Sequence, residues 1–529
     1  YLAFGATHAP HQAPPEYMAK YRGAFDEGWD VFRDRWFARQ KELGLLPEDT
    51  KLAPRNPGVE AWDTLSENQK RLACRLQEAY AAFLDHTDVQ IGRLLTSIEK
   101  LGLDDNTMIV LLADNGASQE GGPFGVLHEM KFFNGIFETP DQAIKSIDDI
   151  GGPNSHNNYP WGWAQVGNTP YRWYKQNTHE GGVHVPMVMH WPNGIPKEQR
   201  GTKRDQFVFV ADIVPTMYDI IGVTPPKVRK GLEQMPVTGH SFKSFLNDPK
   251  APATNTVQHF ENMGSLAIVA GEWKAVLKHQ TGKPYSDEKW ELYHLSIDRS
   301  ECNDLAESEP AKLDEMIAHW WEQAEIHGVL PLDDRGVELF GARFRKNSPH
   351  PEDRRYVYRP PMSPMPSQAS GGVGGRNVDI VANVTYKKGD EGVLYASGTQ
   401  NSGISVFIQN GRLLLDYNAF GDHTIIESAG LVPEGDHQLR AVLRRGDGMS
   451  GYLEVTIDGV SGGSAEVSLF MRMISSVGPS VGFDHGSPIS TRYSAPYAYT
   501  GELHEIIIES GPRRVDTAKA EAQAEMNRQ

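Results

Sequence analysis

The sequence predicts two domains of different class: an α/β domain with helices on both faces of a mixed sheet, followed by an all-β sandwich. Two observations carry this prediction. Between residues 67 and 116 a long helical pattern, an apolar run and a polar turn follow one another, which is the order of an α/β unit. Between residues 376 and 511 apolar residues alternate with a period of two, and turn signals separate the runs.

The composition allows a large core and excludes several classes of protein. Of the 529 residues, 39% are hydrophobic and 23% are charged, as in globular proteins. The 52 Lys and Arg against 69 Asp and Glu give a net charge of −17, which predicts no nucleic acid partner. No apolar run reaches the roughly 18 residues of a membrane span. The oligomeric state and the cellular compartment stay open.

Residues 67 to 101 carry apolar side chains at helical spacing, which predicts a long amphipathic helix. The apolar run from Thr107 to Ala113 predicts a strand covered on both faces of a mostly parallel sheet. It ends in Asp114-Asn115-Gly116, and ligands of such sheets lie outside the carboxyl ends of the strands. Residues 1–4 (Tyr-Leu-Ala-Phe) also predict an apolar strand, so we expect the chain to begin inside a domain.

Further along, residues 121–170 are rich in Gly, Pro and Asn and predict a long loop region near a site. Residues 208–222 predict a short strand and a helix. Residues 266–295 predict antiparallel hairpins and residues 311–327 a closing helix, which together form a small antiparallel subdomain at about 260–330. We expect one α/β domain over residues 1–345 that includes this subdomain.

A Pro/Gly-rich stretch at residues 346–375 predicts a linker between the domains. The sandwich is expected over residues 376–511, with hairpin turns at Asn410-Gly411 and Asp458-Gly459. Residues 512–529 are polar and predict a solvated tail.

Three features carry groups that are able to act on an anionic ligand. The carboxylate of Asp114 and the amide oxygen of Asn115 are hard ligands for Ca²⁺ or Mg²⁺. His8 follows the first expected strand, where it is placed to donate a hydrogen bond or a proton. Lys175 precedes Gly181-Gly182 and offers a point charge for an oxyanion. Taken singly, each has a simpler interpretation: a turn, a loop histidine and a solvated lysine.

The order of the motifs is more specific than any one of them. The segments FGATHAPHQAP, DHTDVQIGRLL, NTMIVLLADNGAS, YKQNTHEGGVHVPMVMHWP and EWKAVLKH occur in this order over roughly residues 1–330. This part of the chain resembles the sulfatase family of the alkaline-phosphatase-like superfamily, and bacterial arylsulfatases with an additional C-terminal domain above all. The β-rich remainder is weakly similar to laminin-G or concanavalin-like sandwiches.

The resemblance implies hydrolysis of a small sulfated substrate at a site with a divalent cation, usually Ca²⁺, and a formylglycine made from a cysteine or serine. By position in the motifs, Asp114 and Asn115 are metal ligands. His8 contacts the sulfate or assists the leaving group, and Lys175 neutralises sulfate oxygens. Such a cluster stabilises the charge that develops as the ester bond breaks.

The chain departs from the family at the nucleophile. Cys74 is followed by Arg-Leu-Gln and Cys302 by Asn-Asp-Leu, so neither lies in a CxPSR motif. The paired aspartates and the Lys-x-His of the family are absent too. We therefore expect a sulfatase domain that is incomplete at its N-terminus and inactive as an isolated chain. A degenerate gene product is the other interpretation. His184 stands where the family often has Arg, which leaves a charge contact there open.

Two other functions stay open from the sequence. One is hydrolysis of phosphoesters or phosphonates by a relative in the same superfamily. The other is carbohydrate binding by a non-catalytic protein, with aromatic residues of the sandwich stacking on sugars. Tyr417, Phe420, Tyr497 and Tyr499 are the candidates, and core packing is their simpler interpretation.

Overall fold

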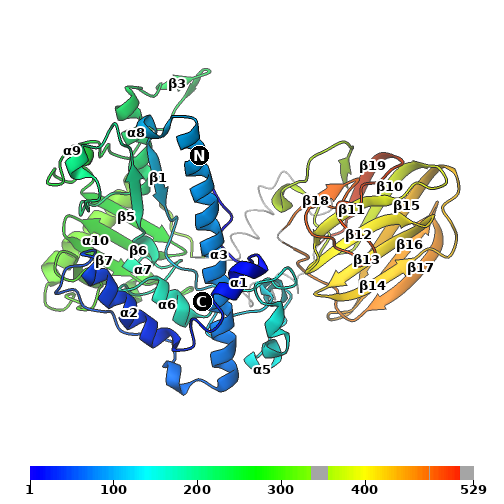
Figure 1. Ribbon diagram of the computed structural model, residues 1–529, viewed down its shortest axis with the longest axis horizontal. Coiled ribbons are helices and arrows are strands. Elements are labelled where there is room, and N and C mark those ends of the chain that lie inside the picture. Colours follow the sequence, from blue (N-terminus) through cyan, green and yellow to red (C-terminus); the bar gives the residue numbers. More distant parts are fainter. Residues whose placement is uncertain (335–354, 476, 513–529) are drawn as a thin grey trace.

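The computed structural model describes residues 1–334, 355–475 and 477–512 (Figure 1). The helices are α1 (Pro15–Lys20), α2 (Gly28–Glu42), α3 (Glu67–Lys100), α4 (Glu129–Phe133), α5 (Pro140–Ala143), α6 (Trp161–Gly167), α7 (Glu180–Val183), α8 (Ile213–Ile221), α9 (Ser244–Asn247) and α10 (Pro310–Ile326). The strands that accompany them are β1 (Ile109–Leu112), β2 (Met187–His190), β3 (Val228–Arg229), β4 (Leu232–Glu233), β5 (Val257–Asn262), β6 (Ser265–Ala270), β7 (Trp273–Leu277) and β8 (Glu291–His294).

The long helix α3 forms as its pattern predicts. Ser66 caps its N-terminus in a capping box with Gln69, which satisfies two backbone N–H groups that have no partner inside the helix. Its first half is buried, with Leu72 and Leu76 almost inaccessible to solvent. Its second half is not covered in the same way, since Leu95 and residues around it are exposed. The helix therefore anchors the core at one end only.

The strand before Asp114 forms, but its predicted environment is wrong. Among the described residues β1 pairs with β2 alone, and the pair is antiparallel rather than part of a parallel sheet. Leu111 is 50% exposed and Leu112 38% exposed, so the strand is not covered on both faces. An apolar run predicts that a strand will be buried, but burial also needs neighbouring elements, and β1 has few.

Three local predictions also differ from the structure. Residues 1–4 form no strand, and Tyr1 is fully exposed, because no neighbouring strand pairs with them. Residues 208–222 contain α8 but no strand. The loop region at residues 121–170 contains the short helices α4, α5 and α6, and Trp163 of α6 is buried in the core. Aromatic packing thus orders a segment whose composition suggested a loop.

The small subdomain matches its prediction. Strands β5, β6, β7 and β8 form an antiparallel sheet in chain order, and α10 packs on it. The core between helix and sheet contains Leu266, Ile268 and Trp320. The Trp320 indole donates a hydrogen bond to the Phe260 carbonyl at 3.1 Å, which satisfies its one polar atom.

The C-terminal domain is a sandwich of two antiparallel sheets. Six strands lie in the order β17-β16-β15-β10-β19-β9, and five in the order β14-β13-β12-β11-β18. Their bounds are β9 (Arg355–Tyr358), β10 (Val378–Tyr386), β11 (Gly392–Thr399), β12 (Ser402–Gln409), β13 (Arg412–Ala419), β14 (Asp422–Glu427), β15 (Gly435–Arg445), β16 (Gly451–Ile457), β17 (Val460–Val467), β18 (Pro479–Val481) and β19 (Glu502–Ser510).

The turns and edges of the sandwich follow from the sequence, with one exception. Asn410-Gly411 and Asp458-Gly459 each have two positive φ angles, as two-residue hairpin turns require. The exception is β9, which lies inside the stretch predicted as a linker and pairs with β19. The prolines around β9 indicate a linker by composition, but prolines are also tolerated at sheet edges, where β9 lies. Residues 346–354 and 513–529 of the predicted linker and tail lie outside the described residues.

Most of the aromatic candidates for sugar binding are structural. Tyr417 is 1% exposed, and its hydroxyl accepts a hydrogen bond from the Met471 amide. Tyr497 stacks on Tyr493 with ring centroids 5.1 Å apart, and Tyr499 packs against the sandwich core. Phe420 lies between the domains. Core packing is therefore the better interpretation of these residues.

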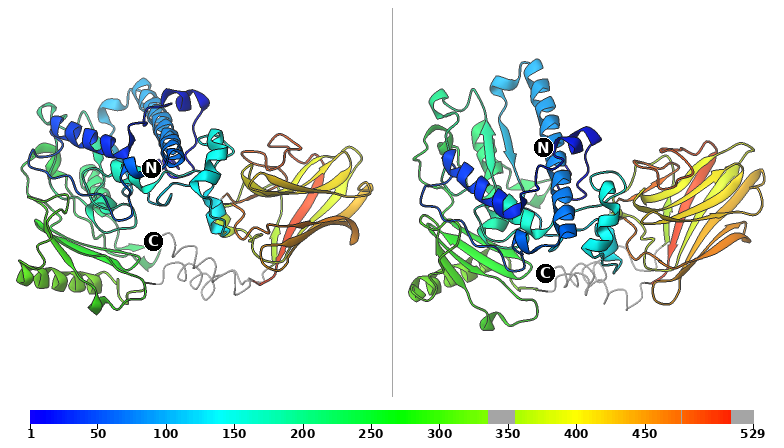
Figure 2. Two further views of the ribbon diagram at one scale, coloured as in Figure 1. Left: turned by 90° about the horizontal axis from the view of Figure 1, so that it is seen from below. Right: turned by 60° about the horizontal axis from the view of Figure 1, so that its bottom comes forward.

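A seam of polar contacts joins the two domains, and we define it by residues 128–134 and 154–155 on one side and 400–401, 420 and 472–473 on the other. Figure 2 shows the segment with α4 and α5 between the rest of the α/β domain and the sandwich. Asn134, 1% exposed, donates to the Met473 carbonyl at 2.9 Å and accepts from the amides of Arg472 and Met473 at 2.6 and 3.3 Å. The side-chain amide of Asn134 thus both donates to and accepts from backbone groups of the sandwich.

The seam also reaches the opening segment of the chain. The Ser155 carbonyl accepts hydrogen bonds from Asn401 at 3.3 Å and from Gln12 at 2.7 Å. Nearby, the ring of Phe420 lies 6.2 Å from that of His128, and the Lys131 ammonium lies 5.9 Å from its centroid. One carbonyl therefore links the sandwich to the segment that carries His8.

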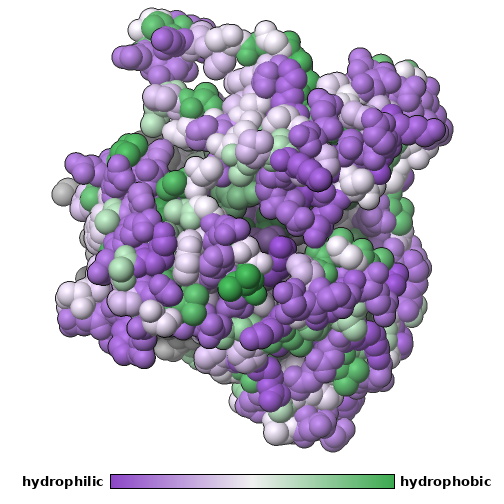
Figure 3. Space-filling model, turned by 90° about the vertical axis from the view of Figure 1, so that its left-hand side faces the viewer, coloured by the Kyte–Doolittle hydropathy of each residue, from purple (hydrophilic) through white to green (hydrophobic). Residues whose placement is uncertain are grey.

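The surface agrees with the acidic composition. Hydrophilic residues cover most of the face of the α/β domain in Figure 3, with smaller hydrophobic patches among them. Within the described ranges, no helix combines the length and the apolar character that crossing a bilayer requires.

The seam generates a first prediction. In the variant Asn134→Ala the backbone groups of Arg472 and Met473 lose their partners inside the protein, at a cost of about 1–3 kcal/mol. We expect faster hydrogen exchange of the amides at 471–474 and a lower melting temperature. Asn247→Ala, at an exposed helix end, is the matched control. Unchanged exchange at 471–474 would show that Asn134 does not hold the seam.

Candidate active site

The opening segment is anchored at His11, which leaves His8 free to reach outward. The His11 amide donates to the Asn157 carbonyl at 3.2 Å, and the Ala13 amide to the Gly151 carbonyl at 3.1 Å. The His11 ring is 1% exposed and stacks on Tyr159 at 5.0 Å. Burial lowers the pKa of His11 to about 3, against the opposing effect of Glu129. His11 is therefore a neutral anchor at pH 7.

Close backbone contact brings the end of β1 to the segment that carries Lys175. The Gly116 amide donates to the Gly182 carbonyl at 3.1 Å, and the Lys175 amide donates to the Ala117 carbonyl at 3.0 Å. A Cβ atom at Gly116 would collide with the Gly181 carbonyl oxygen, so the contact requires glycine. The polar turn after β1 and the lysine segment, about 60 residues apart in sequence, thus form one surface.

Two of the four predicted site residues touch. The Lys175 Nζ atom lies 3.1 Å from the Nε2 atom of His8. The other ring nitrogen of His8, Nδ1, is 3.0 Å from the Ala9 carbonyl oxygen, a group that only accepts. We therefore assign the proton to Nδ1, which leaves the Nε2 lone pair facing the Lys175 ammonium. The side chain of His8 is 57% exposed and open to a ligand.

A carboxylate that the sequence did not single out completes this cluster. Glu120 Oε2 lies 3.1 Å from Lys175 Nζ and 3.4 Å from His8 Nε2, and the Glu120 side chain is 13% exposed. The only signal in the sequence is its place five residues after Asn115, in the same glycine-rich run. Pairing across 55 residues leaves no local pattern.

Asp114 and Asn115 lie at the edge of this cluster without joining it. Asp114 Oδ1 accepts from the Asn115 amide at 3.1 Å, and the Asn115 amide group donates to the Gly116 carbonyl at 2.9 Å. Across the described residues, no ion pair or hydrogen bond joins either side chain to His8 or Lys175. The same contacts leave Asp114 Oδ2 and Asn115 Oδ1 without a hydrogen-bond partner there.

Asp114 Oδ2 and Asn115 Oδ1 are candidate ligands for a cation. Ca²⁺ takes about six to eight oxygen ligands and Mg²⁺ takes six. In the described parts of the chain, no group of three or more His, Cys, Asp or Glu is placed to hold a metal ion. The two oxygens thus fit two positions of a hard-cation site, and the described residues do not supply the rest.

A buried charge network supports the lysine segment from behind. Glu180 accepts from Lys274 at 2.7 Å and pairs with His184 at 2.7 Å, while its amide donates to Glu301 at 2.9 Å. Lys274 also pairs with Glu301 at 3.0 Å, and both side chains are inaccessible to solvent. Burial by itself raises the pKa of Glu180, but Lys274 and His184 outweigh it and hold that pKa well below its ordinary value.

His184 has a structural role as a partner of this network. Its ring stacks on Tyr171 with centroids 4.7 Å apart, and its Nδ1 atom faces Glu180 rather than Lys175. The residue thus supports α7 from the side.

The charge network generates a second prediction. Lys274→Met leaves Glu180 and Glu301 buried without their common cation, which costs about 3–5 kcal/mol. We expect a large drop in the melting temperature and loss of protection from hydrogen exchange at residues 178–184. Lys250→Met, at an exposed position, is the control. If both variants melted alike, the network would carry no net stabilisation.

A third prediction concerns pH. Burial lowers the pKa of both His11 and His128 to about 3, whereas unfolded histidine titrates near 6.5. Below pH 6.5 the unfolded chain binds more protons at these positions, so stability is lost as the pH falls. At pH 5 the loss is about 2 kcal/mol for each histidine.

The variant His11→Phe keeps an aromatic ring beside Tyr159 and removes the titration. Between pH 7 and pH 5 we expect its urea midpoint, followed by tryptophan fluorescence, to fall less than that of the unsubstituted protein. His319→Phe, on the exposed side of α10, serves as the control. An equal fall in all three proteins would contradict the buried neutral state of His11.

Comparison with known proteins shows similarity to sulfatases. Residues 1–223 match the family model described as sulfatase, and residues 169–325 match that of the C-terminal part of N-sulphoglucosamine sulphohydrolase. An uncharacterized sulfatase of Schizosaccharomyces pombe is 32% identical over 351 residues, which cover 64% of this chain and 60% of the relative. An arylsulfatase of Klebsiella aerogenes is 31% identical over 247 residues, covering 46% of this chain and 50% of the relative.

Among solved structures, Ps i-CgsB is 20% identical with a TM-score of 0.37, over 66% of this chain and 54% of that chain. The chain spans between half and three fifths of the length of the two curated relatives above. The matched segments contain His8, the turn after β1 and the Lys175 segment. Over residues 1–223 the α/β domain of this chain matches the sulfatase family.

Proposed function

We propose that this chain forms the greater part of an arylsulfatase-type sulfuric ester hydrolase, which converts a small sulfate ester and water into an alcohol and sulfate. The observation that supports this best is the contact of Lys175 with His8 beside the polar end of β1. An ammonium and an imidazole meet there, and the backbone contact of Lys175 with Ala117 ties them to the turn that carries two hard oxygens. That set suits an anion whose charge increases as its ester bond breaks.

In this proposal the two side chains act on different parts of the ester. Lys175 donates hydrogen bonds to the sulfuryl oxygens and neutralises their charge. His8 is more exposed; once Lys175 turns to the sulfuryl oxygens, the His8 Nε2 atom is free to take up a proton from water and to pass it to the leaving oxygen. The buried network of Lys274, Glu180 and Glu301 holds the neighbouring segment in place, so that Lys175 keeps its position when an anion binds.

Asp114 Oδ2 and Asn115 Oδ1 are proposed as two of the ligands of a divalent cation, Ca²⁺ or Mg²⁺. A bound cation supplies Lewis-acid polarisation of the sulfuryl group. Their position at a strand end gives them a fixed backbone, which hard-cation sites favour. The remaining ligands are proposed to come from outside this sequence.

The nucleophile is proposed to come from outside this sequence as well. Neither cysteine lies in a CxPSR context. Cys74 is a core residue, 7% exposed, whose thiol donates to the Phe25 carbonyl at 3.4 Å. Burial raises the pKa of Cys74 to about 12, so its thiol is a poor nucleophile. A chain with these two cysteines alone is expected to show no turnover.

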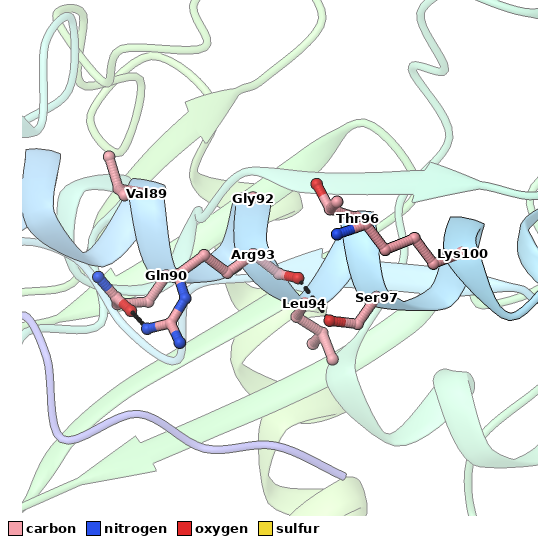
Figure 4. A pocket seen from close by; sticks show the side chains of 8 residues that line it. All are labelled: Val89, Gln90, Gly92, Arg93, Leu94, Thr96, Ser97 and Lys100. Atoms are coloured by element: carbon pink, nitrogen blue, oxygen red, sulfur yellow. Dashed lines mark hydrogen bonds between the residues drawn. The ribbon is translucent and has the colours of Figure 1, made fainter.

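Uncovered apolar surface supports the idea that a further segment completes the domain. The second half of α3 borders a shallow, open depression that residues of this helix alone line (Figure 4). Apolar side chains between 38% and 72% exposed lie on four elements around β1: Val89, Leu94, Leu95 and Leu101, then Leu111 and Leu112, then Val188, then Val214, Met217 and Ile221. So much exposed apolar surface is unusual for a finished domain.

A fourth prediction tests the proposal with 4-nitrophenyl sulfate. We expect no turnover by the chain of residues 1–529. We expect turnover once the chain is extended by the residues encoded upstream in the same reading frame and expressed with a formylglycine-generating enzyme. In that extended protein Lys175→Ala should lower kcat/KM by about 10²- to 10³-fold.

Lys203→Ala, at an exposed position of the same domain, is the control for the extended protein. Turnover by the unextended chain would contradict the assignment of the nucleophile. Full activity of the Lys175→Ala variant would remove Lys175 from the site.

A further inference from the structure

Glu120 has no part in the function proposed above, although it lies at the centre of the cluster. Its carboxylate pairs with the Lys175 ammonium, the group that the proposed function assigns to the anionic ligand. Oε2 lies 3.1 Å from the Lys175 ammonium, and both side chains are mostly buried. A negative charge in a site for anions repels the ligand, so its presence there needs an explanation.

The carboxylate of Glu120 is held in place by more than the lysine. The Ser118 hydroxyl donates to Oε2 at 2.9 Å, and the Glu120 amide donates back to that hydroxyl at 3.1 Å. On the other side, the Gln176 amide group lies 3.4 Å from Oε1. Gln176 itself has a φ of 72°, in the left-handed region. The chain thus fixes the acid on both sides, so its direction toward Lys175 is built into the loop.

A fixed negative charge acts differently on different anions. A sulfate ester carries one negative charge, whereas free sulfate carries two at neutral and alkaline pH. The repulsion from one carboxylate is proportional to the charge of the ligand, so it is twice as large for the dianion at the same distance. Lys175 also attracts the dianion twice as strongly, and the repulsion from Glu120 offsets part of this preference for the dianion.

We infer that Glu120 is a charge filter of the anion site, which shifts its selectivity away from doubly charged oxyanions such as free sulfate and toward singly charged sulfate esters. This inference rests on the proposed function of Lys175 as the sulfate contact. In the empty site Glu120 pairs with Lys175, and a bound ester shares the ammonium with it. Once the ester is cleaved, the product carries a second charge, so Glu120 repels it twice as strongly as it repels the ester.

The test is calorimetric titration at pH 8 with methyl sulfate as the monoanion and inorganic sulfate as the dianion. The proteins are the unsubstituted chain, Glu120→Gln, Lys175→Met and Glu16→Gln, the last being a control at an exposed glutamate of α1. Glutamine keeps the size of Glu120 and, with its oxygen toward Ser118 and Lys175, these two hydrogen bonds, but it removes the charge and the acceptor that faces Gln176. A melting curve for each variant checks that it is folded.

In Glu120→Gln we expect the Kd of methyl sulfate to fall about 3-fold and that of sulfate about 10-fold, since the gain for the dianion is roughly the square of the gain for the monoanion. Lys175→Met should abolish binding of both anions, and Glu16→Gln should change neither. A merely structural role of Glu120 would weaken binding on substitution, not strengthen it.

The other outcomes separate the two proposals. An equal gain in affinity for both anions, or weaker binding by Glu120→Gln, would overturn the charge filter. The proposed function would still stand as long as binding depends on Lys175. Binding that survives in Lys175→Met, or no binding by any protein, would overturn the role of Lys175 and the filter with it.

Discussion

The contact of Gly116 with the backbone of Gly181 and Gly182 is the constraint on which the candidate site depends. It joins the end of β1 to the lysine segment at a separation that no side chain would permit. Without it, Asp114 and Asn115 would lie on one element and Lys175 on another, with no fixed relation. The double glycine therefore sets the geometry of the site rather than its chemistry.

Charge is arranged in two layers behind and within this contact. The buried layer of Lys274, Glu180 and Glu301 is inaccessible to solvent and positions α7. The outer layer of Lys175, Glu120 and His8 is partly exposed and available to a ligand. Because the inner Lys274 is buried between two carboxylates, the outer lysine, which is itself paired with Glu120, is the cation that a ligand meets. The residues that stabilise the fold and the residues proposed to bind a ligand thus lie on two neighbouring stretches of chain.

Several parts of the fold could be predicted from the sequence because their signals are local. The helical period of α3, the alternation of the sandwich strands and the two hairpin turns each depend on residues close in the chain. The exposure of β1 could not be predicted in this way, since an apolar run does not tell whether neighbours cover it. The strand β9 was missed because prolines mask its pattern. In the candidate site, the motif residues His8 and Lys175 meet, whereas Glu120 joins them by a long-range ion pair that has no sequence pattern.

The two hydrogen bonds to the Ser155 carbonyl connect distant functions of the molecule. Gln12 and Asn401 share this one acceptor, and Gln12 lies four residues after His8. A force that moves the sandwich away from the α/β domain must either break the bond to Asn401 or carry the Ser155 loop with it. The Ser155 carbonyl is thus a shared attachment point of the sandwich and of the segment that follows His8.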